Sequence, residues 1–176
     1  MNHTDHVALI RGGVHSGTAI WGELGCGDGA FTRALANLLL PGSTIHAVDR
    51  NRPALRSLET TMARQHPRVT LITHNTDFTQ PMPFMPRLDG LLLANSLHFV
   101  TDKGPLLRSF RMELLRENGR VLVVEYNTDR SNKWVPYPLS WTTWQDLASE
   151  AGFKRTTLLA THPSRFLGEF YAAIAQ

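Results

Sequence analysis

Three glycines at alternate positions, Gly25, Gly27 and Gly29, follow a short apolar run, and Glu23 stands two residues before the first of them. Glycine tolerates positive φ angles and lets a ligand come close to the main chain. The helix expected after these glycines would present N–H groups that favour negative charge. A tight turn between a strand and a helix also needs glycines, so this segment alone leaves a structural role and a ligand-binding role open.

Two further acids favour ligand binding because each follows a predicted strand. Asp49 lies twenty residues after Gly29, where nucleoside sites place a carboxylate that accepts hydrogen bonds from ribose hydroxyls. Asp77 follows the next predicted strand and could accept a hydrogen bond from an adenine amino group. A single acid at such a position is more often a helix cap or turn residue. Three acids in register with strand ends indicate a nucleoside ligand.

The spacing of the glycines separates two classes of nucleoside ligand. Dinucleotide sites usually show G-x-G-x-x-G, with helix N–H groups on a pyrophosphate. This chain has E-x-G-x-G-x-G instead, in the segment ELGCGDG. A carboxylate beside the turn would repel a pyrophosphate but suits a ligand that carries an ammonium group. The chemistry therefore favours S-adenosylmethionine over NAD.

The elements that must position these residues alternate between strands and helices. The tail adds two strand candidates, joined by Pro163-Ser164. This order predicts right-handed crossovers and an α/β, doubly wound, Rossmann-like sheet of seven strands, mostly parallel, with a C-terminal antiparallel hairpin and helices on both faces. Ligands of such sheets lie beyond the carboxyl ends of the strands. We expect strands at 19–24, 43–49, 68–75, 88–96, 119–126, 153–162 and 165–175, and helices at 30–40, 52–66, 102–118 and 140–152.

Length and composition limit the possible classes of protein. The 176 residues fit a single domain spanning 1–176, with 1–18 as a short N-terminal helical or cap segment. A net charge of +3 with scattered arginines gives little support for nucleic-acid binding. A single cysteine excludes an internal disulfide and a cysteine-based zinc cluster. With no secretory signal and no apolar run of about 20 residues, we expect a cytoplasmic protein without membrane contact.

Five segments, in order, resemble the motifs of class I S-adenosylmethionine-dependent methyltransferases. They are WGELGCGDG, HAVDR, NTDFTQP, LDGLLLANSLHFV and LLRENGRVLVVEY, and the closing EAGF with two strands resembles the family's reversed hairpin. The branch most resembled methylates small molecules such as ubiquinone or arsenite. The resemblance implies S-adenosylmethionine as methyl donor and a small-molecule acceptor. The chain lacks the NPPY or DPPY of enzymes that methylate nucleic-acid amines, and its single cysteine disfavours a multi-thiol arsenite site.

The resemblance also implies which residues bind the cofactor. The glycine segment would line its methionine part, and Asp49 would bind the ribose hydroxyls. Asp77 and the main chain of Phe78 would contact adenine, while the carbonyl of Asn95 would face the methionine ammonium. The full expected set is Glu23, Gly25, Cys26, Gly27, Gly29, Asp49, Arg50, Asp77, Phe78, Asn95 and Ser96. We expect no metal, because the oxygen-ligand set that holds magnesium in catechol-type methyltransferases is not visible at the strand ends, and terminal histidine clusters such as HTDH at 3–6 rarely bind a metal.

Methyl transfer from a sulfonium needs a well-placed acceptor more than a dedicated nucleophile. A general base is required only if the acceptor must lose a proton. His98 is the best base candidate, although local packing or hydrogen bonding would also account for it. Tyr126, between Glu125 and Asn127, closes the fifth predicted strand, and one of these three is expected to touch substrate.

Several alternatives stay open at this point. The aromatic residues that follow the fifth strand would either pack the core or form a wall for a flat acceptor; they are Trp134, Tyr137, Trp141 and Trp144. Little chain precedes the glycines, so the substrate site would be open or covered by the second subunit of a homodimer. A non-catalytic S-adenosylmethionine sensor or partner subunit is the main rival. An NAD-dependent oxidoreductase is disfavoured by the glycine spacing.

Overall fold

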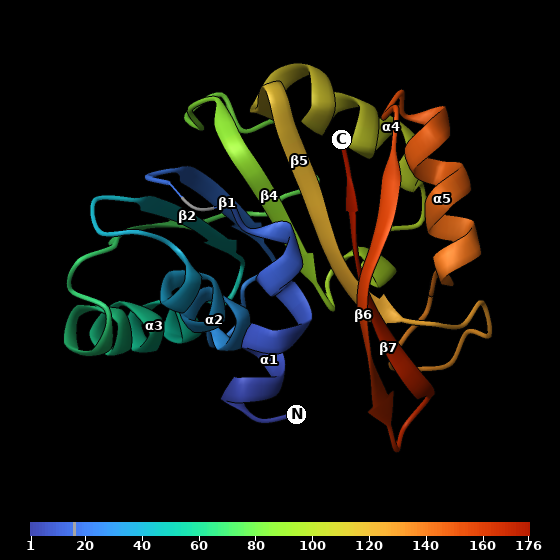
Figure 1. Cartoon of the computed structure of the whole chain (residues 1–176), viewed down its shortest axis with the longest axis horizontal. Helices are drawn as coiled ribbons and strands as arrows, with labels where there is room; N and C mark the ends of the chain where they lie inside the picture. The colour runs from blue at the N-terminus through green and yellow to red at the C-terminus, as the bar shows by residue number, and fades with distance from the viewer. Residues whose placement is uncertain (16) are drawn as a thin grey trace.

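The computed structural model describes residues 1–15 and 17–176. Figure 1 shows a single mixed sheet of seven strands in the order β3-β2-β1-β4-β5-β7-β6. β1 to β5 are parallel, and β7 runs antiparallel to both β5 and β6. The predicted fold class is confirmed. The strands are β1 (Ile20–Leu24), β2 (Thr44–Asp49), β3 (Thr70–Asn75), β4 (Leu88–Ala94), β5 (Leu115–Tyr126), β6 (Thr156–Ser164) and β7 (Gly168–Ala175).

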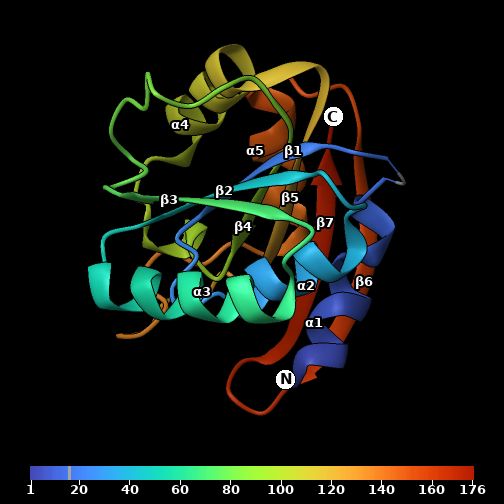
Figure 2. The ribbon, with the colours of Figure 1, turned by 90° about the vertical axis from the view of Figure 1, so that its left-hand side faces the viewer.

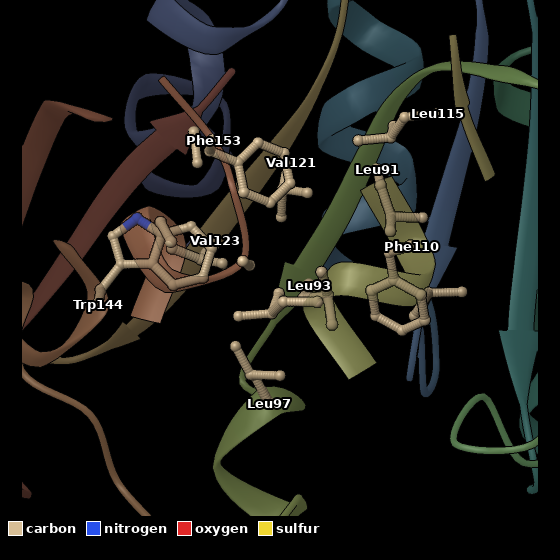
Figure 3. Packing of buried hydrophobic residues seen from close by; sticks show 14 of the residues in the cluster. Leu91, Leu93, Leu97, Phe110, Leu115, Val121, Val123, Trp144 and Phe153 are labelled. Atoms are coloured by element: carbon tan, nitrogen blue, oxygen red, sulfur yellow. The ribbon is translucent and has the colours of Figure 1, made fainter. Parts of the chain in front are cut away.

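Helices cover both faces of the sheet, as Figure 2 shows from the side of β3. α1, α2 and α3 pack on one face, over a buried cluster that includes Trp21 and Leu58. α4 and α5 pack on the other face, and Figure 3 shows how Phe110 and Trp144 meet the leucines and valines of β4 and β5 there. The helices are α1 (His3–Ile10), α2 (Ala30–Leu38), α3 (Arg52–Gln65), α4 (Lys103–Ser109) and α5 (Trp141–Glu150).

The strand order creates a switch point beside β1. From β1 the chain crosses one face to reach β2 on one side, and β4 joins β1 on the other side. Loops leaving the carboxyl ends of these strands therefore diverge, and ligands of doubly wound sheets bind in the space between them. The glycine turn at 25–29 leaves β1 at this point.

The predicted helix at 102–118 is too long. α4 ends at Ser109, a π turn covers Phe110–Leu114, and Leu115 already has extended geometry with φ −85° and ψ 145°. The guanidinium of Arg87 donates to the carbonyls of Met112 and Leu115, at 2.6 and 3.0 Å, and so satisfies groups that the ended helix leaves free. Pairing of β5 with β4 therefore overrides the helical periodicity of LLREN.

The hairpin turn also lies later than predicted. Pro163 and Ser164 belong to β6 and pair with Glu169 and Gly168, so the turn is 165–167. β6 is the edge strand of the sheet, where a proline without an N–H is tolerated.

The predicted helical character of the N-terminal segment is found in α1. Its first turn has a reciprocal cap in which Asp5 donates its N–H to the Asn2 side chain, and Asn2 donates its N–H to Asp5. The buried residues of α1 are Val7, Leu9 and Ile10. In the part of the chain that the structure describes, no helix is long and apolar enough to cross a bilayer.

A pair of glycine substitutions tests the close contact of β1 with β4. A Cβ at Gly90 would lie 2.4 Å from the buried ring of Trp21, whereas a Cβ at Gly104 in α4 would meet no atom closer than 3.8 Å. We expect Gly90→Ala to lower the free energy of unfolding by about 1–3 kcal/mol, because the sheet must open to admit the methyl group. The matched change Gly104→Ala should leave stability unchanged or raise it by up to about 1 kcal/mol. Urea unfolding of both variants measures this, and equal losses would contradict the packing described.

Candidate functional site

The glycine turn is tied to the end of β2 by three hydrogen bonds. The N–H groups of Gly25 and Cys26 both donate to the carbonyl of Val48, at 2.8 and 3.1 Å. The N–H of Gly27 donates to a carboxylate oxygen of Asp49 at 2.7 Å. The turn is therefore held in one shape by the neighbouring strand.

The three glycines of the turn have positive φ angles, for two different reasons. Their φ values are 76°, 53° and 81° in chain order. A Cβ on Gly25 would lie 2.5 Å from Ser96, and one on Gly29 would lie 2.2 Å from Leu58, so packing excludes side chains there. A Cβ on Gly27 would meet nothing within 4 Å. Gly27 thus presents bare main chain to open space, which fits close approach of a ligand.

Asp49 also organises the loop that follows β2. Its second carboxylate oxygen accepts the N–H of Asn51 at 2.7 Å, and Asn51 in turn caps α3 by accepting the N–H of Ala54. The side-chain amide of Asn75 donates to the carbonyls of Asp49 and Arg50. The Asp49 carboxylate is therefore fixed at the same edge as the glycine turn, as expected for a ribose ligand.

Asp77 and its neighbours form the far side of this edge. One carboxylate oxygen of Asp77 accepts both the N–H and the hydroxyl of Thr79, at 2.9 and 2.8 Å. The hydrogen bond from the Thr79 main chain, assisted by Arg50, lowers the pKa of Asp77. Arg50 itself is exposed and reaches Asp77 at 3.3 Å. Phe78 packs against the core beside Gly25.

Glu23 and Cys26 lie beneath the turn rather than at its surface. Glu23 is 2% exposed, and its Oε2 has no hydrogen-bond partner among the residues described. Burial raises the pKa of Glu23 to about 8, so the carboxyl is mostly protonated at pH 7. This does not fit the expectation that Glu23 supplies negative charge to a ligand. Burial likewise raises the pKa of the Cys26 thiol, which makes it a poor nucleophile.

The end of β4 brings two predicted cofactor residues to the turn. Asn95 has φ 54°, the only positive φ of a non-glycine residue within 1–15 and 17–176, and its buried Oδ1 lacks a partner there. Strain and an unsatisfied polar atom together are typical of a functional position. Ser96 differs, since its hydroxyl is buried and donates to the carbonyl of Leu24 at 2.6 Å. It joins the ends of β4 and β1.

His98 is held by a buried carboxylate that sequence reasoning did not single out. Glu125, 1% exposed at the end of β5, accepts the main-chain N–H groups of Leu97 and His98 through Oε1. Its Oε2 lies 2.6 Å from Nδ1 of His98. The Nε2 atom of His98 has no hydrogen-bond partner in the described part of the chain. The sequence did offer one signal for this role. Glu125 is an acid within the apolar run of β5, and a buried acid requires a hydrogen-bond partner.

Aromatic rings surround the His98 end of the site. Tyr126 stacks on Phe170 with ring centroids 4.2 Å apart and meets the edge of Phe166 at 5.9 Å. The ring of His98 lies 6.4 Å from that of Tyr126 and 4.3 Å from that of Phe99. Phe99 and Phe166 are more than half exposed. They provide apolar surface at this edge.

Of the four aromatic residues after β5, two pack against the core and two are exposed, and a role as acceptor wall stays a prediction. Trp144 is fully buried in the core, and Trp141 packs edge-on against Tyr171. Trp134 and Tyr137 are exposed.

Comparison with known proteins identifies the family. A family model described as "Methyltransferase domain" matches residues 23–121, more than half of the chain. The chain belongs to this family. A search of proteins with curated functions found no match.

Solved structures share the fold at low sequence identity. A SAM-dependent methyltransferase from Leishmania major is 17% identical, with TM-score 0.73; the match covers 97% of this chain and 72% of the Leishmania chain. The N-terminal domain of EvdMO1, solved in the presence of SAH and D-fucose, is 17% identical with TM-score 0.72, over 100% and 83%. A putative O-methyltransferase from Nostoc punctiforme is 20% identical with TM-score 0.72, over 99% and 57%. This chain spans 41% of full EvdMO1 and 53% of the mitomycin 7-O-methyltransferase MmcR.

The buried carboxyl of Glu23 predicts an unusual dependence of stability on pH. Its pKa is about 8 in the folded chain against 4.5 for the free side chain, so the folded state holds an extra proton between these values. The free energy of unfolding should therefore fall as pH rises from about 4.5 to about 8, by up to about 1.4 kcal/mol per pH unit. Glu23→Gln should remove this pH dependence. The difference in free energy of unfolding between Glu23→Gln and wild type should therefore shift in favour of the variant as pH rises toward 8. Unfolding by urea at several pH values measures it, and parallel profiles for the two proteins would contradict the assignment.

Proposed function

We propose that this chain binds S-adenosylmethionine beyond the carboxyl ends of β1, β2 and β4 and transfers the methyl group to a small-molecule acceptor. The observation that carries the proposal is the glycine turn, which presents the bare main chain of Gly27 to open space beside the fixed carboxylate of Asp49. Membership of the methyltransferase domain family supports it.

The donor set around the turn fits the three parts of this cofactor. The main chain of 25–29 and the strained Asn95 would bind the amino-acid part. A carboxylate can accept about four hydrogen bonds, so Asp49 can bind ribose hydroxyls while keeping its two main-chain partners. Asp77 and Phe78 would meet the adenine. Glu23, Cys26 and Ser96 support the turn from below.

Methyl transfer then depends on how the chain positions and deprotonates the acceptor. The cofactor supplies a methyl group on a sulfonium, which is already a good leaving group. Holding the acceptor in line is the chain's first contribution. The second is proton removal: Glu125 fixes the His98 ring through Nδ1, which leaves Nε2 as the atom able to take a proton from an acceptor.

The surroundings of His98 favour a flat, hydroxylated acceptor. Tyr126, Phe99 and Phe166 offer aromatic faces and edges near the base, where they can stack on a ring. A base next to such a surface suits a phenol or hydroquinone, whose oxygen becomes nucleophilic on losing its proton. Within the small-molecule branch, a quinol therefore agrees better with these residues than arsenite does.

A non-catalytic sensor is the second candidate, because it would use the same cofactor residues. The His98–Glu125 pair argues against it. Burying these two polar groups is costly and serves no purpose in cofactor binding alone. Homodimerisation, the absence of a metal and a cytoplasmic location stay predictions.

Cofactor binding is tested by calorimetric titration with S-adenosylmethionine, S-adenosylhomocysteine and NAD. We expect the two adenosyl ligands to bind and NAD not to bind. Asp49→Ala should weaken adenosyl binding about tenfold or more, because it removes charged acceptors and frees the Gly27 N–H. Asp146→Ala is the matched control, since it removes an exposed carboxylate from α5, away from the turn, and should leave binding unchanged. Binding of NAD alone would contradict the proposal.

Catalysis is tested separately by changing the base. His98→Asn should lower kcat about 10²- to 10⁴-fold toward a hydroquinone while the affinity for S-adenosylhomocysteine stays the same. Glu125→Gln should lower kcat less, because the ring of His98 keeps a hydrogen-bond partner but loses the carboxylate that orients it. His66→Asn, which changes a histidine at the end of α3, is the control. Full activity of His98→Asn would exclude the base role and leave positioning as the sole contribution.

A further inference from the structure

A second cavity lies at the opposite edge of the sheet, where β5 begins and β7 ends. Its volume is about 780 Å³. Figure 1 places this edge near the C-terminus, away from the β6–β7 turn. The walls come from the π turn, the first residues of β5, the 152–155 loop before β6, and Gln176. We call it the amino-edge groove.

The amino-edge groove concentrates positive charge. One acid, Glu117, lines it against six basic side chains, so the groove carries a formal +5. The whole chain carries +3, and the remainder is therefore −2. The fold brings together arginines that are scattered in the sequence. The six are Arg87, Arg111, Arg116, Arg120, Lys154 and Arg155.

Two of these arginines already have structural partners. Arg87 donates to two main-chain carbonyls at the end of the π turn. Arg116 forms an ion pair with Asp89 at 2.5 Å. Arg87 keeps its charge in these hydrogen bonds, whereas Asp89 offsets the charge of Arg116. Counting Asp89 with Glu117, the groove is left with a formal +4.

Arg120 is the buried member of this group. It is 8% exposed, and its guanidinium forms no hydrogen bond or ion pair within residues 1–15 and 17–176, which include all fifteen carboxylate side chains. Burial, with the charge of Arg155, lowers the pKa of Arg120. The guanidinium of Arg155 faces the side-chain amide of Gln176, which neutralises nothing. The guanidinium nitrogens of Arg120 keep some contact with solvent and have no counter-anion among these residues, so they can meet an anion bound in the groove.

Part of the wall of the amino-edge groove is apolar. Met112, Leu115 and Phe153 line it next to the basic residues. An adjoining cavity of about 500 Å³ shares the 116–120 segment and extends the space toward His15. Volumes of this size are typical of sites for small organic ligands.

We propose that the amino-edge groove binds a small organic anion with several phosphate groups, of the nucleoside polyphosphate class. Guanidinium groups match phosphate oxygens in pairs, and more than one guanidinium here suits more than one phosphate. The apolar wall would take the organic part. This site is separate from the methyl-donor site; only the use of S-adenosylhomocysteine as blocking ligand in the test rests on the proposed function.

The test measures binding of adenosine triphosphate in the presence of saturating S-adenosylhomocysteine, which blocks the other site. Inorganic tripolyphosphate, sulfate at equal ionic strength and a short RNA are the comparison ligands. We expect adenosine triphosphate to bind most tightly and to raise Tm. Equal affinity for tripolyphosphate would overturn the organic part of the proposal, and preference for RNA would overturn the small-molecule part.

Arg120→Met separates an anion site from a structural arginine. We expect this variant to have a higher Tm than wild type without ligand, because it removes a buried uncompensated charge. It should also bind adenosine triphosphate about tenfold or more weakly, while its affinity for S-adenosylhomocysteine is unchanged. Arg56→Gln, which removes an exposed arginine from α3, should change neither.

A double variant at the exposed rim covers the case in which Arg120→Met does not fold. Arg111→Gln combined with Lys154→Gln should also weaken adenosine triphosphate binding, because both side chains line the groove. Unchanged affinity in this variant, or no binding by wild type at millimolar concentration, would overturn the proposal.

Discussion

The carboxylate of Asp49 fixes the geometry on which the candidate site depends. It accepts the N–H of Gly27 on one side and that of Asn51 on the other, each at 2.7 Å, and so joins the turn after β1 to the start of α3. Three positive φ glycines would otherwise leave this turn many conformations. Because the turn is already ordered, the binding free energy of a ligand is not reduced by the entropic cost of ordering it. The same carboxylate remains able to accept further hydrogen bonds from that ligand.

A second carboxylate, that of Glu125, joins the ends of β4 and β5 in the same way. Glu125 holds both the main chain and the ring of His98, and the antiparallel pairing of Glu125 with Tyr171 anchors it in the sheet. In the proposed function, Asp49 would position the cofactor and Glu125 the acceptor, at one edge of the sheet. Within this buried pair, Glu125 takes up Nδ1 of His98 and leaves Nε2 without a partner in the part of the chain that the structure describes.

Sequence patterns predicted the fold and the gathering of the glycine turn and Asp49 at one edge of the sheet, because strand ends and glycine turns are local features. They missed what depends on long-range pairing. The helix at 102–118 stops early because Leu115 pairs with Leu88, which no local periodicity encodes. Glu23 was expected to carry charge, but its burial under the turn follows from packing across the sheet. Glu125 gained its role only through His98, 27 residues earlier in the chain. The arginines of the amino-edge groove come together in the same way.

The ligand is expected to lie at the carboxyl edge of β1, β2 and β4. Amide NMR spectra recorded during titration with S-adenosylhomocysteine test this most directly. We expect the amides of Gly25, Gly27, Gly29, Arg50 and Phe78 to shift together, while those of Gly119 and Gly152 at the opposite edge stay in place. Shifts confined to Gly119 and Gly152, or no shift at saturating ligand, would contradict it.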